Sequence, residues 1–107
     1  MTPVFDGHND LLLRLHSHPE NREAIWSGED GKGHLDLPRM KAGGFAGGFF
    51  AIYIPSATDA DFAGVDKLME KPPYLAPLPR LIPCATAQPV ALSMAGHLMA
   101  LERTGTL

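Results

Sequence analysis

Cysteine is almost missing from this sequence, since Cys84 is the only one among 107 residues. A single thiol cannot form an internal disulfide, and it allows neither a CxxC pair nor a Cys/His zinc-finger spacing. Long apolar runs are missing too, because Leu11 to Leu13 and Phe49 to Ile54 fall far short of the roughly 20 residues that cross a bilayer. The start of the chain lacks the basic and apolar segments of a secretory signal. These absences predict a cytoplasmic protein without a membrane anchor.

Positive charge is not in excess either. The chain has 9 Lys and Arg against 12 Asp and Glu, a formal net charge of -3, and no basic stripe that could neutralise a phosphate backbone. Nucleic acid is therefore excluded as an expected partner. A composition of 45% hydrophobic and 20% charged residues is typical of an ordinary globular protein rather than a disordered one.

Two segments are expected to be parallel strands. Val4-Phe5 is apolar and is followed by the polar residues 6–10 and then by an apolar helix from Leu11 to Leu15. The run from Phe45 to Pro55 is apolar without alternation, which is typical of a parallel strand covered on both faces. Residues 16–33 have no lasting period and predict an irregular segment with about one helical turn.

Helices are expected around these strands. Asp36 is placed to cap a short helix that ends in a left-handed turn at Gly43 or Gly44. Residues 59–70 have the spacing of a short amphipathic helix, and the prolines from 72 to 83 predict an extended surface loop. A stripe at i, i+4, i+8 and i+11 predicts a final helix with Pro89 in its first turn and a stop at Gly105; the stripe consists of Val90, Met94, Leu98 and Leu101.

This order of elements describes βα units rather than a finished fold. Two strands make no closed core, and a parallel sheet needs both faces covered. The chain is therefore expected to be either an unusual small domain or, as we favour, the first part of a larger α/β domain that continues with another strand after Leu107.

His8 and Asp10 are the candidate metal ligands. Alternation along a strand points residues i and i+2 to the same side, so one imidazole and one carboxylate can converge on a zinc ion. The alternative is that Asp10 caps the helix beginning at Leu11 while His8 simply ends a strand. Residue types alone favour this alternative, because a His-x-Asp triplet often arises by chance. Asn9 is expected to be a hydrogen-bonding neighbour of the site or a helix-start residue.

Three segments together carry a resemblance to a known family: PVFDGHND at residues 3–10, GHLDLPR at 33–39 and AGGFAGGFFAIYIP at 42–55. Their order and spacing resemble the membrane dipeptidase (renal dipeptidase) family of zinc metallopeptidases. The resemblance implies an α/β fold in which residues 1–107 form the amino-terminal part of a single TIM-type (β/α)8 barrel domain, incomplete in this chain. It also implies two zinc ions in the complete enzyme, with His8 and Asp10 matching the first pair of metal ligands.

The implied activity is hydrolysis of dipeptides, with a carboxyl residue of either hand, by a hydroxide that bridges the two zinc ions. The remaining ligands and the acid/base aspartate of the family come from later strands, so the catalytic residues of this protein stay unknown and the 107-residue chain by itself is expected to be inactive. Tyr53, near the end of the second strand, is expected to line the substrate cleft, or else to be a buried tyrosine with a satisfied hydroxyl. A homodimer of the complete enzyme stays open.

Two alternatives to a dipeptidase remain at this point. One is another metal-dependent barrel amidohydrolase, because a His-x-Asp pair reports metal binding and says little about substrate. The other is a non-catalytic truncated domain that acts as an interaction module.

Other polar residues have simpler explanations. His34 and Asp36 repeat the His-x-Asp pattern, but Asp36 has a role as a helix cap. His97 is expected to be half-buried beside the apolar stripe, and His16 and His18 to face water in a loop. The glycine pairs at 43–44 and 47–48 fit no phosphate-binding motif and are explained by capping and close backbone packing.

Overall fold

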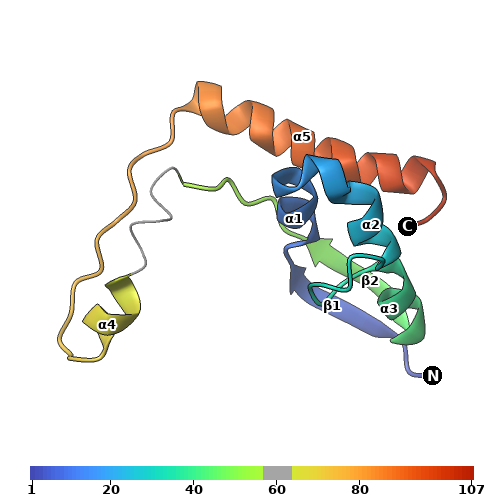
Figure 1. Cartoon of the computed structure of the whole chain (residues 1–107), viewed down its shortest axis with the longest axis horizontal. Coiled ribbons are helices and arrows are strands. Elements are labelled where there is room, and N and C mark those ends of the chain that lie inside the picture. The colour runs from blue at the N-terminus through green and yellow to red at the C-terminus, as the bar shows by residue number, and fades with distance from the viewer. Residues whose placement is uncertain (57–63) are drawn as a thin grey trace.

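The computed structural model describes residues 1–56 and 64–107 and shows a mixed α/β chain (Figure 1). The elements are, in order, β1 (Val4–Asn9), α1 (Leu11–Ser17), a 3-10 turn η1 (Pro19–Asn21), α2 (Arg22–Ser27), α3 (Leu37–Ala42), β2 (Phe45–Phe50), α4 (Val65–Met69) and α5 (Cys84–Arg103). Within the described ranges no helix is both long and apolar enough to cross a membrane.

The two strands pair in parallel, as predicted. β1 ends among the polar residues at Asn9, as predicted, whereas β2 ends at Phe50 instead of Pro55. A strand extends only as far as it is hydrogen-bonded to a neighbouring strand, and Asn9, the last residue of β1, pairs with Phe50. The apolar residues after Phe50 have no paired strand in the described part of the chain and therefore do not continue β2.

Helices cover one face of this sheet (Figure 1). The buried core lies there and is formed by Leu11, Leu15, Ile25, Trp26 and Met40, with Phe45 and Phe50 packed against it. Among residues 1–56 and 64–107, no helix covers the opposite face, contrary to the prediction of a strand covered on both faces. Phe5 and Phe49 lie there at 62% and 66% exposure, in an edge-to-face contact with ring centroids 5.3 Å apart.

The predicted cap of α3 is confirmed. Asp36 occupies the N-cap position, where its Oδ1 accepts the backbone N–H of Arg39 at 2.8 Å, and its side chain is almost fully buried. Gly44, with φ of +70°, provides the left-handed turn that follows the helix. Only glycine adopts this backbone conformation without steric cost, which explains why the helix stops here.

The final helix crosses α1 and buries the predicted stripe, with Met94 fully buried and Val90, Leu98 and Leu101 partly so. Its start differs from the prediction. α5 begins at Cys84, so Pro89 lies inside the helix rather than in the first turn. A proline ring has no N–H, so Pro89 costs the helix one backbone hydrogen bond. This cost is why the sequence predicted that the helix starts close to Pro89.

An excursion joins β2 to α5 and extends away from the core (Figure 1). Of the helix predicted over residues 59–70, the structure describes α4; residues 59–63 of the prediction lie outside the described part. Residues 74–83 have no regular secondary structure, as expected, and Leu75, Leu78 and Leu81 are each more than 90% exposed. The radius of gyration is 16.7 Å, against about 13 Å for a compact domain of this length.

Candidate metal centre

A β-bulge shapes the end of β1. Asp6 pairs with Gly48 and Asn9 with Phe50, so β1 contains one residue more than β2 over the same stretch. A bulge bends its strand and redirects the side chains within it. His8 lies in this bulge, and Asp10 follows the strand at the N-cap position of α1. Strict strand alternation, the basis of the sequence prediction, is therefore broken at this point.

The imidazole and the carboxylate nevertheless come together. His8 Nε2 lies 3.4 Å from Asp10 Oδ1, and the two side chains are 67% and 57% exposed. Two ligands held at about 2.0–2.1 Å from a tetrahedral zinc ion lie about 3.3 Å apart. The donor set and its spacing therefore fit two ligands of one zinc ion.

The alternative role of Asp10 as a helix cap is not seen, because its side chain makes no capping hydrogen bond. Asn9 takes this task instead: its Oδ1 accepts the backbone N–H of Leu11 at 3.3 Å. Its Nδ2 donates to Asp6 Oδ2 at 2.9 Å and to the carbonyl of Phe49 at 3.5 Å. Asn9 is thus the helix-start residue that the sequence suggested.

Asp6 was missed by the sequence reasoning. Its Oδ1 accepts the backbone N–H of His8 at 3.2 Å, in addition to the bond from Asn9. An aspartate that accepts the N–H two residues later is a common local pattern. The segment Asp6-Gly7-His8 contains that signal, but it lies within the residues predicted as the end of a strand.

The described residues place no third metal ligand beside this pair. Among residues 1–56 and 64–107 no three His, Cys, Asp or Glu side chains are grouped so that they could hold a metal ion. A groove of about 580 Å³ adjoins the pair and is also lined by His34. The second His-x-Asp pattern forms no site, because Asp36 is buried as a helix cap. The described residues therefore group only two candidate ligands, His8 and Asp10, where catalytic zinc has three.

Tyr53 lies three residues beyond the end of β2 and is 48% exposed. It is therefore not a buried tyrosine within this chain. No described contact tests its predicted place in a substrate cleft.

The other histidines differ in their surroundings. His16 lies in α1, not in the predicted water-facing loop, and its Nδ1 is buried without a hydrogen-bond partner. His97 is half-buried on α5, as predicted, with Nε2 3.4 Å from Ser93 Oγ. Burial lowers the pKa of His97 below 6.5, and the positive charges of Arg22 and of His16, when it is protonated, lower it further.

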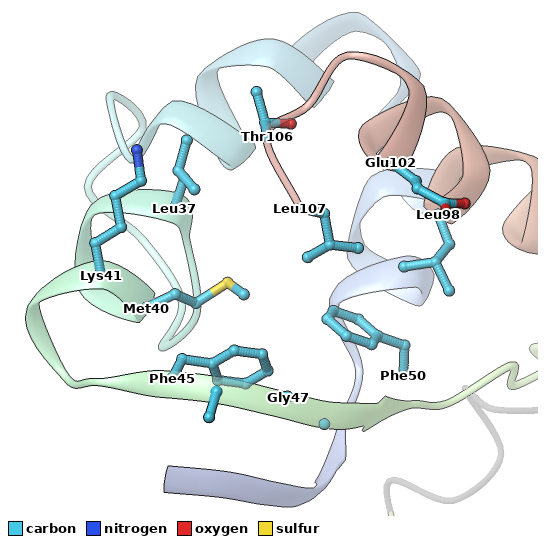
Figure 2. A pocket seen from close by; sticks show the side chains of 12 residues that line it. Leu37, Met40, Lys41, Phe45, Gly47, Phe50, Leu98, Glu102, Thr106 and Leu107 are labelled. Carbon is cyan, nitrogen blue, oxygen red and sulfur yellow. The ribbon is translucent and has the colours of Figure 1, made fainter. Parts of the chain in front are cut away.

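A second groove of about 550 Å³ lies between β2, α3 and the end of α5 (Figure 2). Its walls are mainly apolar and include Met40, Phe45, Phe50 and Leu98. Its charged lining residues, Lys41 and Glu102, come from different helices, whereas His8 and Asp10 lie side by side, so the end of β1 is the better candidate for chemistry.

An α/β chain that presents an imidazole and a carboxylate at the carboxyl end of a parallel strand has the features of a metal-dependent hydrolase. Residues 1–93 match the family model described as Membrane dipeptidase (Peptidase family M19), and the chain belongs to this family. The resemblance found in the sequence is thereby confirmed.

Two solved structures are similar over 96% of this chain. One is a metallo peptidase from Rhodobacter sphaeroides liganded with a phosphinate mimic of the dipeptide L-Ala-D-Ala, at 62% identity and a TM-score of 0.81. The other is the dipeptidase AC, a metallo peptidase of the same family, at 61% identity and a TM-score of 0.79. This chain covers 29% and 28% of those chains.

A curated relative extends the comparison. The protein named as an uncharacterized protein in the PQQ-III 3' region of Acinetobacter calcoaceticus is 53% identical over 55 residues, which cover 50% of this chain and 17% of the relative. The chain thus spans less than a third of the length of each of these relatives.

Proposed function

We propose that this chain supplies the first two metal ligands, His8 and Asp10, of a zinc-dependent dipeptidase. The observation that carries the proposal is their 3.4 Å separation at the exposed end of β1, in a chain that belongs to a dipeptidase family. The Rhodobacter relative, which is liganded with a dipeptide mimic, supports a dipeptide as the substrate. This favours a dipeptidase over another amidohydrolase.

We further propose that residues 1–107 are the first units of a (β/α)8 barrel. One face of the two-stranded sheet is covered by helices, while Phe5 and Phe49 are exposed on the other. In such barrels the inner face is filled by bulky side chains from all eight strands. This chain covers 29% of the length of a solved relative, and its two strands would be a quarter of the eight strands of such a barrel. The two fractions are similar.

The roles of the residues follow from this arrangement. Two zinc ions would activate the attacking water and polarise the peptide carbonyl. His8 would hold one ion through a ring nitrogen and Asp10 through a carboxylate oxygen. Tyr53 follows the carboxyl end of β2, on the same edge of the sheet, and would line the dipeptide cleft. The remaining ligands and the acid/base group would come from later strands, so the isolated chain would be inactive.

The test uses full-length protein with His8→Ala or Asp10→Ala. Each variant is expected to lose bound zinc, measured by elemental analysis, and to lose more than about 100-fold in kcat/KM on L-Ala-D-Ala, because removing a ligand costs more than removing its hydrogen-bond partner. Asp66→Ala, on the exposed side of α4 and outside the groove beside the pair, is the control and should keep both properties. Wild-type zinc content and turnover in both ligand variants would overturn the proposal.

A panel of substrates separates the two hydrolase classes. The full-length enzyme is expected to cleave dipeptides with either hand at the carboxyl residue and to leave lactams and N-acyl amides intact. The reverse preference would favour the amidohydrolase alternative.

A further inference from the structure

We infer that Asp6 and Asn9 are positioning residues that fix the bulged end of β1 so that His8 and Asp10 converge on one cation. The inference rests on the proposed role of His8 and Asp10 as metal ligands. It adds two residues that touch no metal and act through the backbone and through one another.

Asp6 compensates for the bulge. The extra residue in β1 interrupts the regular pairing at His8, and a backbone donor that leaves the ladder needs another acceptor. Asp6 Oδ1 provides it, accepting the His8 N–H at 3.2 Å. Its second oxygen accepts Asn9 Nδ2 at 2.9 Å, so one carboxylate fixes both the ligand's backbone and the residue that follows it.

Asn9 links three elements. Its side chain bonds Asp6 in β1, the carbonyl of Phe49 in β2 and the N–H of Leu11 in the first turn of α1. The two ligands flank this residue directly in sequence. Any rotation of the chain at Asn9 would therefore change the direction of both ligands.

Gly48 on β2 gives Asp6 the room it needs. A Cβ at this position would lie 2.8 Å from Phe45 Cζ, 3.1 Å from the Asp6 Cβ and 3.2 Å from the Asp6 carbonyl oxygen. All three are closer than ordinary contacts, so a larger residue would crowd both the Phe45 ring and Asp6. Gly48, which fits no phosphate-binding motif, is in this way part of the support for the site.

These bonds matter because the ligands themselves are unsupported. His8 and Asp10 are both more than half exposed, so their directions depend on the backbone beneath them. Metal ligands held by hydrogen-bonded neighbours bind more tightly, and losing such a neighbour typically costs 10–100-fold in affinity.

The first test measures zinc affinity in full-length protein by competition with a chromophoric chelator. Asp6→Asn turns one acceptor into an NH₂ group that faces the NH₂ of Asn9, and Asn9→Asp sets two carboxylates against each other. Each variant is expected to bind zinc about 10–100-fold more weakly. The absorption spectrum of the cobalt-substituted protein, which is sensitive to ligand geometry, should change as well. Asn9→Leu, of similar shape and uncharged, serves if Asn9→Asp does not fold.

The decisive variant is the double exchange Asp6→Asn with Asn9→Asp. It restores one donor opposite one acceptor and keeps acceptors for the N–H groups of His8 and Leu11. Zinc affinity should recover at least tenfold over the weaker single variant. Asp66→Asn, which removes the same charge from the exposed side of α4, is the control and should bind zinc as the wild type does.

The results separate this inference from the proposed function. If His8→Ala and Asp10→Ala weaken zinc binding but Asp6→Asn and Asn9→Asp stay within twofold of wild type, the positioning role is wrong and the function stands. A double variant no better than the weaker single, or a lower melting temperature with unchanged zinc affinity, also overturns it. If the ligand variants themselves bind zinc normally, the proposed function fails first.

Discussion

His-x-Asp occurs twice in this chain, and burial separates the two cases. Asp36 is 2% exposed and its carboxylate is engaged by the N–H of Arg39, so it is committed to a helix cap. His8 and Asp10 are exposed, and an exposed ion pair contributes only about 0–1 kcal/mol to folding. The contact itself adds little to folding, which agrees with the metal-binding role proposed for the pair.

Tyr53 provides a prediction at the residue scale. In full-length enzyme, Tyr53→Phe is expected to raise KM for a dipeptide about 2–10-fold with a smaller change in kcat, because one hydrogen bond to substrate is worth about 0.5–1.5 kcal/mol. Steady-state kinetics measures both constants. Tyr74→Phe, the same change in the excursion, is the control. An unchanged KM would remove Tyr53 from the substrate cleft.

The helices show how an element depends on its neighbours. The stripe on α5 could be read from spacing alone, because a buried face repeats every three to four residues. Its start could not, since Pro89 is an unfavourable interior residue that is tolerated where packing against α1 compensates. The same packing brings His97 of α5 close to His16 of α1 and Arg22 of α2.

This contact predicts a pH dependence. The pKa of His97 is lower in the folded protein than 6.5, so the unfolded chain binds more protons just below that pH. Stability should therefore be unaffected by this group above pH 6.5 and should fall as the pH drops below it. Thermal unfolding of full-length protein at pH 8 and 5.5 measures the effect. His97→Gln should show a smaller acid-dependent loss than the wild type.

His34→Gln, at an exposed histidine, is the matched control for that measurement. If His97→Gln and the wild type lose the same stability between the two pH values, the partial burial of His97 on α5 does not govern its protonation.

At the scale of the whole molecule, the described part of the chain leaves apolar surfaces exposed to solvent. The sheet has two strands, one of its faces is bare at Phe5 and Phe49, and three leucines of the excursion point into solvent. Exposed apolar area of this kind is typical of surfaces that pack against something else. The low compactness of the chain agrees with this interpretation.

The isolated 107-residue chain is therefore expected to bind zinc at least about 100-fold more weakly than full-length protein, since its described part groups no three ligands. It should hydrolyse no dipeptide and should bind a hydrophobic dye such as ANS. Chelator competition, a dipeptidase assay and dye fluorescence measure these properties. A cooperative melt without dye binding or any response to zinc would instead favour an independent interaction module.

The sequence by itself determined the parallel strands, the cap of α3, the stripe of α5 and the residue types of the candidate site, because periodicity, capping and donor chemistry are local properties. Only the tertiary structure decided how His8 and Asp10 meet. Their approach depends on a bulge that exists only where β1 pairs with β2, and on a hydrogen-bond network around Asp6 and Asn9 that also reaches β2. The bulge and the bond from Asn9 to the carbonyl of Phe49 join residues about 40 positions apart, which no local pattern records.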